Sequence, residues 1–221
     1  MLKQLCYFIS IFFFSVSMAQ ASKLSYSNVG FSYVKQSIDD SNDSKSLNLL
    51  VNFALTKDFF LMAKYNEGNF YDDSNAEHVS HKIGIGYHFQ LDQDTDMVVS
   101  FAYTEADIED LSINFEIAGS EELALLSSEQ SGYSFSAGIH NKVNDKFELN
   151  VDLIHLDVDL EAVTTASFMG SQVVVDSEFS SRDTYFALSA YYYLTDSLSL
   201  SFSSSSLTNS DIAEFGFRLD F

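Results

Sequence analysis

The sequence predicts an all-β protein whose antiparallel strands follow one another along the chain and close into an up-and-down barrel. Apolar residues alternate with small or polar residues over most of the chain, and short breaks alternate with longer, acidic ones. Alternation with a period of two is typical of a strand that has one apolar face. The chain also contains no Pro, which favours paired strands because Pro cannot donate a ladder hydrogen bond.

Residues 1–21 are expected to be a cleaved signal peptide rather than part of the fold. Lys3 supplies a positive start, residues 6–16 form an apolar run, and residues 19–21 have the A-x-A form of a cleavage site. The run is too short to cross a bilayer as a helix, although an uncleaved anchor is the alternative. The fold is therefore expected to be one domain over residues 22–221, which contains no cysteine.

Ten strands are expected from the alternating segments. They span residues 24–35, 45–55, 59–68, 79–90, 97–107, 131–143, 147–158, 180–194, 198–204 and 212–221. Short turns are expected at 56–58, 91–96, 144–146 and 195–197, and longer breaks at 36–44, 69–78, around 119, around 170 and at 204–211. Short connections on one side and long ones on the other, with an even strand count, are typical of membrane-spanning barrels. Eight strands remain possible because some segments are short.

Two hairpins are expected to be longer than a membrane requires. The alternation that begins at Met97 keeps the same face at every second position up to Ile117, which places one hairpin tip at residues 119–120. A second tip is expected at residues 169–171. The apolar parity shifts by one residue at Ile154, which predicts a β-bulge there. A short helix over residues 120–128 is the alternative for the first returning segment.

The composition of the polar rows favours a membrane barrel over a water-soluble one. These rows contain mostly Ser, Gly, Ala and Asn, whereas a water-facing strand surface is usually rich in charged residues. Small residues suit a crowded barrel interior. Aromatic residues gather near the expected strand ends, where membrane barrels carry interfacial girdles: Tyr26, Phe31, Tyr33, Phe59, Tyr65, Tyr87, Phe89, Tyr103, Tyr133, Phe147, Tyr185, Tyr192, Phe202 and Phe221.

The C-terminus carries the most specific pattern. Apolar residues occupy every second position and the chain ends on an aromatic residue: Phe215, Phe217, Leu219 and Phe221. This segment resembles the terminal strand of outer-membrane β-barrel proteins, and the whole mature chain resembles their small OmpA/OmpX-like and porin-like families. The resemblance implies that these four residues form an insertion signal for the barrel-insertion machinery. It also implies periplasmic chaperones, a bacterial outer-membrane location, and contact with outer-membrane lipids and lipopolysaccharide.

Charged residues of both signs fall on the rows expected to face the barrel lumen: Lys64, Lys82, His88, His140, Lys142, Glu148, Asp152, Glu214, Arg218 and Asp220. Because both signs occur, we expect a network of ion pairs and hydrogen bonds that fills the lumen. The alternative is a narrow polar pore lined by the same groups. A wide pore is not expected, because ten strands enclose little more space than the eight-stranded barrels that side chains fill.

The net charge of −21 argues against nucleic-acid binding, since the phosphate backbone would be repelled. Acidic residues crowd the expected outer connections: Asp39, Asp40, Asp43, Asp72, Asp73, Glu105, Asp107, Glu109, Asp110, Glu121, Glu122, Asp157, Asp159, Glu161, Asp176 and Glu178. Carboxylates are hard oxygen ligands, so weak Ca²⁺ or Mg²⁺ binding at the outer rim is a hypothesis. No dedicated cofactor is expected, and no cysteine accompanies the histidines as in a typical zinc site.

The sequence thus predicts a non-enzymatic, monomeric outer-membrane protein with a structural or surface role that presents acidic hairpins outside. A narrow porin-like channel for small solutes or ions is the first alternative. A barrel enzyme that acts on lipid or peptide is the second. An enzyme of that kind needs a nucleophile beside a base, and Ser80 near His78 and His81 is the one local pairing of this type that the sequence suggests.

Overall fold

The computed structural model describes residues 24–38, 43–69, 76–117, 120–168, 171–207 and 210–221, so the expected signal peptide lies outside the described residues. Ten strands form one closed barrel, which confirms the ten-strand prediction. No helix in the described part of the chain is long and apolar enough to cross a membrane. The strands are β1 (Asn28–Ile38), β2 (Ser44–Ala54), β3 (Phe59–Asn69), β4 (Glu77–Gln90), β5 (Thr95–Ile117), β6 (Ser120–Asn144), β7 (Phe147–Phe168), β8 (Ser171–Tyr193), β9 (Leu198–Leu207) and β10 (Ser210–Asp220).

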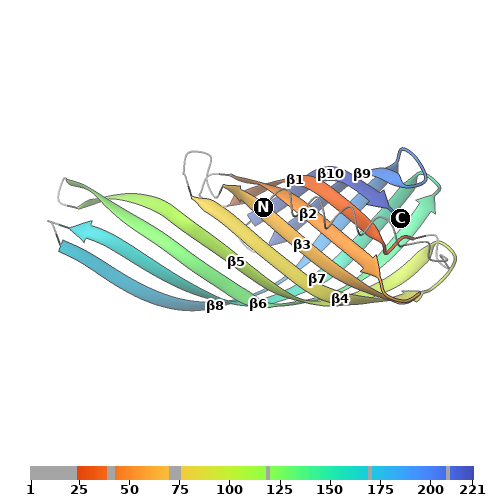
Figure 1. The fold of residues 1–221 in the computed structure, drawn as a ribbon, viewed down its shortest axis with the longest axis horizontal. Coiled ribbons are helices and arrows are strands. Elements are labelled where there is room, and N and C mark those ends of the chain that lie inside the picture. The colour runs from red at the N-terminus through yellow and green to blue at the C-terminus, as the bar shows by residue number, and fades with distance from the viewer. Residues whose placement is uncertain (1–23, 39–42, 70–75, 118–119, 169–170, 208–209) are drawn as a thin grey trace, which may run out of the picture.

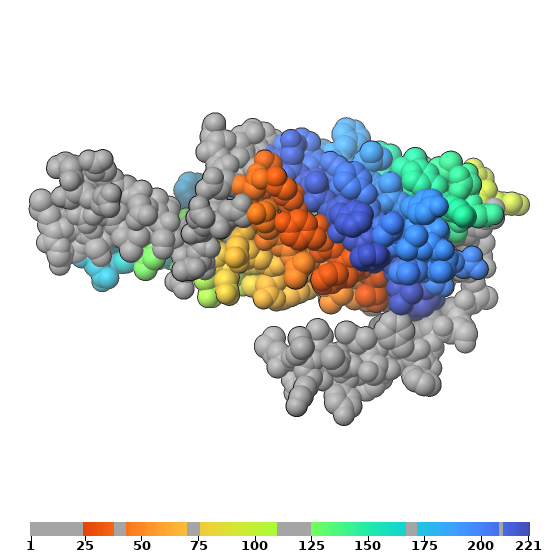
Figure 2. Space-filling model, turned by 90° about the horizontal axis from the view of Figure 1, so that it is seen from above, coloured from red at the N-terminus to blue at the C-terminus, as the bar shows by residue number. Residues whose placement is uncertain are grey.

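The barrel closes where the first strand meets the last. Strand β1 pairs antiparallel with β2 on one side and with β10 on the other. The β1–β10 register runs from Asn28 opposite Asp220 to Ile38 opposite Ser210. Figure 2 shows these two ends of the chain, coloured red-orange and blue, side by side on the barrel wall. Where all ten strands are paired, closure leaves no open edge, and the backbone groups are hydrogen-bonded to one another, as a membrane environment requires.

The four short turns lie where the sequence predicts them, and two of them share one local design. In the β2–β3 turn the Thr56 hydroxyl oxygen accepts a hydrogen bond from the Phe59 amide at 3.0 Å. In the β8–β9 turn Thr195 accepts the matching bond from the Leu198 amide, also at 3.0 Å. Such side-chain turns are favoured by Ser and Thr.

Of the expected boundaries that differ from the structure, two lie near the ends of the chain. The first strand begins at Asn28 rather than at residue 24. The break expected over 204–211 is much shorter, because β9 continues to Leu207 and β10 begins at Ser210. The serine-rich end of β9 is polar on both faces, so the alternation that marks a strand is absent there although the backbone remains paired.

The described barrel is apolar outside and polar inside. Ile85 of β4 is 43% exposed and Phe215 of β10 is 54% exposed, whereas Asn48, Asp96 and Ser199 are at most 2% exposed. Apolar surface kept in water costs about 25 cal/mol per Å², so a continuous outward belt of large apolar side chains is stable only against lipid. On most strands this belt consists of about four outward side chains at alternate positions. Such a span is close to the 9–11 residues with which a strand crosses a bilayer.

Strands β5 to β8 continue beyond the ends of the other strands as a four-stranded extension (Figure 1). Strand β5 pairs with β4 only as far as Glu109, and β8 pairs with β9 only from Ala187 onward. Pairing among β5, β6, β7 and β8 continues past both points. The two long hairpins are therefore confirmed, and the helix considered for residues 120–128 is wrong because these residues belong to β6.

The bulge expected at Ile154 is also wrong. The register runs evenly through Ile154, which lies opposite Ser136 on β6 and Tyr185 on β8. Register shifts occur instead at 108–111 of β5 and 142–144 of β6. The parity changes at Ile154 because β7 passes from the lipid level into the extension. There the outward face becomes acidic and the inward face becomes apolar.

An arginine placed on the lipid-facing row should reveal where the membrane lies. We expect Ile85→Arg to destabilise the barrel by about 2–4 kcal/mol, the cost of a cation near the bilayer midplane. Val173→Arg is the matched control, since Val173 is similarly exposed but lies in the extension, where we expect a change within about 0.5 kcal/mol. Denaturant unfolding of protein refolded into lipid vesicles measures both. Equal effects of the two substitutions would contradict the placement of the lipid belt.

Candidate functional site

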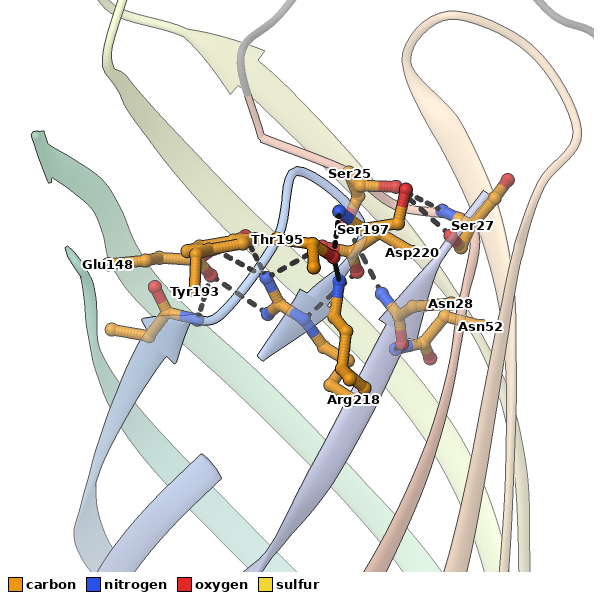
Figure 3. Close-up of polar contacts among 12 residues, drawn as sticks. Ser25, Ser27, Asn28, Asn52, Glu148, Tyr193, Thr195, Ser197, Arg218 and Asp220 are labelled. Carbon is orange, nitrogen blue, oxygen red and sulfur yellow. Dashed lines mark hydrogen bonds and ion pairs between the residues drawn. The ribbon is translucent and has the colours of Figure 1, made fainter. Parts of the chain in front are cut away.

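The lumen at the end that carries the short turns is occupied by a buried ionic cluster around Arg218 (Figure 3). Arg218 of β10 reaches across to β7, where its Nη1 and Nη2 donate to the two carboxylate oxygens of Glu148 at 3.0 and 2.6 Å. Its Nε lies 3.0 Å from Oδ1 of Asp220. Arg218 is 6% exposed and Glu148 is 2% exposed. A two-pronged Arg–carboxylate pair is among the strongest hydrogen-bonded arrangements in proteins.

Two tyrosines of β8 complete this cluster. The Tyr193 hydroxyl donates to Glu148 at 2.6 Å and accepts a hydrogen bond from Arg218. The guanidinium carbon of Arg218 lies 3.8 Å from the ring centroid of Tyr191. The charged group is therefore held by hydrogen bonds at its edge and by an aromatic face, which fixes its orientation in the lumen.

The segment that precedes β1 enters the same end of the lumen. The Tyr26 ring stacks on the His88 imidazole with 4.0 Å between centroids, and on Phe60 with 5.0 Å. Its hydroxyl donates to Oδ2 of Asp96 at 2.9 Å, and that oxygen also lies 3.0 Å from Nδ1 of His88. Residues 24–27, which were expected to begin the first strand, thus precede it and enter the lumen. Tyr26 is luminal rather than interfacial.

Gly86 of β4 makes this stack possible. A β-carbon at Gly86 would overlap the Phe60 ring. Because glycine has no side chain, the Phe60 ring can approach the β4 backbone closely at the position where it stacks on Tyr26.

Further from the short turns, a second group of polar contacts joins β1, β2, β3 and β10. Lys64 of β3 lies 3.6 Å from the Glu214 carboxylate of β10. Glu214 also accepts a hydrogen bond from the Asn48 amide at 2.5 Å and another from the Ser32 hydroxyl. Glu214 is therefore surrounded by donors from three strands, which offsets the cost of removing its charge from water.

The remaining predicted luminal residues lie between these groups or near the turns. His140 and Asp152 approach to 3.2 Å, and Lys142 places its ammonium 4.4 Å from the Tyr193 ring centroid. Lys82 of β4 lies directly opposite Lys64 in the β3–β4 register. Among the residues that the structure describes, Lys82 has no hydrogen-bond or ion-pair partner.

The structure thus places all ten predicted luminal residues on inward-facing positions and joins seven of them to one another. They form three groups, which are Arg218 with Glu148 and Asp220, Lys64 with Glu214, and His140 with Asp152. Sequence reasoning missed Tyr26, Asp96, Tyr191 and Tyr193. Tyr192 is exposed, and neighbouring residues of a strand point to opposite faces. The alternation along this strand would therefore have placed Tyr191 and Tyr193 inside. Nothing local in the sequence indicates that Tyr26 and Asp96 meet, because 70 residues separate them.

A cavity of about 510 Å³ lies in the lumen above the Arg218 cluster. Its lining combines polar residues of β3 and β4, among them Lys64, Lys82 and Ser80, with apolar residues of β7. The apolar residues that β7 contributes are Ile154, Leu156 and Val158. The lumen is therefore polar at the turn end and amphipathic where the extension begins.

The pairing considered for an enzyme divides between the two faces of β4. Ser80 and His78 both line the lumen cavity, whereas His81 packs against the Tyr65 ring on the outer face, with 5.1 Å between centroids. Neighbouring residues of a strand point to opposite faces, so Ser80 and His81 cannot act together. Within the described residues, no group of three or more His, Cys, Asp or Glu side chains is arranged to hold a metal ion.

The outward face of the extension carries a row of carboxylates that crosses all four strands. Asp107 of β5 lies opposite Glu129 of β6, Glu129 lies opposite Glu161 of β7, and Glu161 lies opposite Glu178 of β8. Like charges directly opposite one another on a sheet are unfavourable. The sequence marked three of these residues as acidic but did not place them in one row, and it overlooked Glu129.

An acidic residue of the β1–β2 connection has a different environment. Asp43 lies 2.5 Å from the Lys35 ammonium and accepts a hydrogen bond from the Ser37 hydroxyl at 2.9 Å. The hydrogen bond from Lys35, followed by that from Ser37, lowers the pKa of Asp43 below its usual value. This carboxylate is therefore locally neutralised, unlike the row on the extension.

No protein-family model matches the chain, and no curated protein sequence matches it. Several solved structures are similar. The outer membrane protease OmpT of Escherichia coli aligns with a TM-score of 0.60 at 9% identity, over 94% of this chain and 99% of that chain. The translocator domain of the autotransporter NalP of Neisseria meningitidis aligns with a TM-score of 0.55 at 10% identity, over 90% of this chain and 89% of that one.

The attachment invasion locus protein Ail of Yersinia pestis aligns over 87% of this chain and 95% of its own, at 14% identity and a TM-score of 0.39. The similarity to OmpT and NalP is one of fold. It agrees with the closed antiparallel ladder and shows that the chain has the fold of outer-membrane β-barrel proteins.

Breaking the buried ion pair should destabilise the barrel strongly. We expect Arg218→Met to cost about 3–5 kcal/mol, because Glu148 would remain buried without its main partner. Arg182→Met is the matched control, since Arg182 also bonds a carboxylate, Asp157 at 3.0 Å, but in an exposed position, where a loss below about 1 kcal/mol is expected. Urea unfolding of the refolded proteins gives both values. A similar loss for both variants would show that the buried Arg218–Glu148 pair contributes no more to stability than an exposed ion pair does.

Neutralising one member of the carboxylate row should stabilise the extension. We expect Glu161→Gln to gain about 0.2–1 kcal/mol for each of the two like-charge pairs that it removes. Asp159→Asn is the control, because Asp159 lies on the same strand but opposite Ser131 and Ser180. Amide hydrogen exchange of β6 and β7 at low salt measures the difference, which should shrink near 1 M salt as the charges are screened. Equal protection in the two variants would refute the repulsion.

Proposed function

We propose that this chain is a non-enzymatic, monomeric protein of a bacterial outer membrane, which uses its barrel as an anchor and presents the β5–β8 extension at the cell surface. The observation that carries this proposal is the exchange of polarity along β7. Outward Val151 and Leu153 are followed on the same face by Asp159 and Glu161, all of them exposed. A strand with this pattern is suited to lipid at one level and to water above it.

The luminal contacts support an anchor rather than a wide pore. The Arg218 cluster and the Tyr26 stack occupy the turn end of the lumen with side chains from six strands and from residues 24–27. Buried polar networks that are held together by hydrogen bonds and ion pairs rigidify a structure. They also leave little cross-section for solute passage in a ten-stranded barrel.

The carboxylate row gives the extension its chemical character. Asp107, Glu129, Glu161 and Glu178 face outward across four strands. Such a row attracts cations and basic groups. At an outer-membrane surface the expected neighbours are lipopolysaccharide and the divalent cations that accompany its phosphates, with weak and exchangeable binding of Ca²⁺ or Mg²⁺ through carboxylate oxygens.

A narrow channel is the second candidate, because the cavity above the cluster is lined by ionisable groups that include Lys64 and Lys82. Planar-bilayer recording separates the two functions. An anchor should give no steady conductance steps. Steps that change in size or ion selectivity with Lys82→Gln would establish the channel and overturn the anchor.

Surface labelling tests the placement and the orientation. The chain has a single cysteine, Cys6, within the expected signal peptide, so one cysteine can be introduced at a time. In intact cells, a membrane-impermeant maleimide should label Asp159→Cys in the extension. It should not label Lys57→Cys in the β2–β3 turn until the outer membrane is permeabilised.

Equal labelling of both positions in intact cells would contradict this orientation. Recovery of the protein in the soluble periplasmic fraction would contradict the membrane anchor itself. Heat-modifiable gel mobility provides the folding control for each variant, since a folded barrel migrates differently from the unfolded chain.

A further inference from the structure

We propose that the lumen cavity is a binding site for a small organic anion that carries one acidic group and an apolar body. In this assignment Lys82 holds the acidic group, and Ile154, Leu156 and Val158 contact the apolar body. The inference goes beyond the anchoring function, because it concerns the inside of the barrel rather than the displayed extension.

The first argument is an unmatched positive charge. Three other ionisable groups that line the cavity have a close partner: Lys64 lies beside Glu214, Asp152 beside His140, and Arg218 beside Glu148. Lys82 lines the same cavity and has no such partner among the described residues. In the β3–β4 register Lys64 lies directly opposite Lys82, which is an unfavourable pairing of like charges. An anion beside Lys82 would neutralise this excess charge.

The second argument is the apolar wall. The inward rows of most strands carry serine and asparagine at membrane level, such as Ser32, Asn48 and Ser134. Strand β7 changes at Ile154, and the inward Ile154, Leu156 and Val158 line the cavity together with Tyr185 of β8. Val158 is already buried at 3% exposure, whereas Ile154 and Leu156 remain partly exposed to the lumen, so an apolar ligand would bury them further.

The third argument is size and access. Ligand pockets in proteins measure about 300–1,000 Å³ and combine an apolar lining with a few polar groups that orient the ligand. The lumen cavity, at about 510 Å³, falls within this range. Its turn end is occupied by the Arg218 cluster and Tyr26, so a ligand would enter from the side of the extension.

The charge balance of the lining restricts the ligand class. One cation is unmatched, and the carboxylates of Asp152 and Glu214 line the same cavity. A second negative charge on the ligand would therefore meet repulsion at short range, where low dielectric strengthens it. A monovalent carboxylate with an aromatic or branched aliphatic body fits these constraints better than a phosphate or a polyanion.

The test is isothermal titration of the refolded full-length barrel in detergent micelles with 2-naphthoate, and with the neutral 2-naphthamide as the matched ligand control. We expect saturable binding of 2-naphthoate and at least about tenfold weaker binding of the amide, because a hydrogen bond to a charged donor would be lost. Lys82→Met should weaken 2-naphthoate binding by a similar factor. Lys57→Met, in an exposed turn, should leave it unchanged.

A second variant tests the apolar wall independently of the charge. Leu156→Ser should weaken both ligands by a similar factor, since it removes apolar contact without changing the net charge. Heat-modifiable mobility checks that each variant is folded, and Lys82→Gln replaces Lys82→Met if the latter does not refold. Absence of saturable heat with the unmodified protein, equal affinity for acid and amide, or unchanged binding in the Lys82 variant would each overturn the proposal.

Discussion

The hydrogen-bonded ladder between β1 and β10 is the constraint on which the rest of the molecule depends. In a bilayer no water is available to satisfy backbone groups, so a sheet that crosses it must close. Closure continues past the strand ends at the turn side, where the Phe221 amide donates to the Ser27 carbonyl at 3.0 Å and the Asp220 amide donates to Ser197 at 2.7 Å. Because the two ends of the chain meet there, residues 24–27 and the inward side chains of β10 enter the same lumen.

Closure also explains why polar chemistry gathers inside. Once the outward rows face lipid, each inward charge must find a partner within a narrow space or remain costly. Arg218 reaches Glu148 across the intervening strands β9 and β8, and Tyr193 lies between them. Lys82 differs from Lys64 and Arg218, because it lines the lumen cavity without an ion-pair partner among the described residues. Such an unmatched charge indicates a candidate site rather than a packed interior.

The extension differs from the closed barrel in its neighbouring strands and in its outward residues. Strands β5 to β8 keep their mutual pairing but lose β4 and β9 as neighbours. Outward positions can then carry carboxylates, and inward positions can carry Ile154 and Leu156. One continuous strand, β7, thus contributes a lipid-facing row, a water-facing acidic row, a buried ionic group and the apolar wall of a cavity.

The sequence by itself determined the all-β class, the ten strands, the four short turns, the long hairpins and the outward position of Phe215 and Phe217, because period-two alternation and turn residues are local properties of the chain. Only the tertiary structure decided that Tyr26 stacks on His88, that Arg218 meets Glu148, and that four carboxylates form one row. These contacts depend on the register between distant strands and on the way the barrel closes. Ile154 shows the same limit, since a change of surroundings along a regular strand produces the same apolar pattern as a bulge.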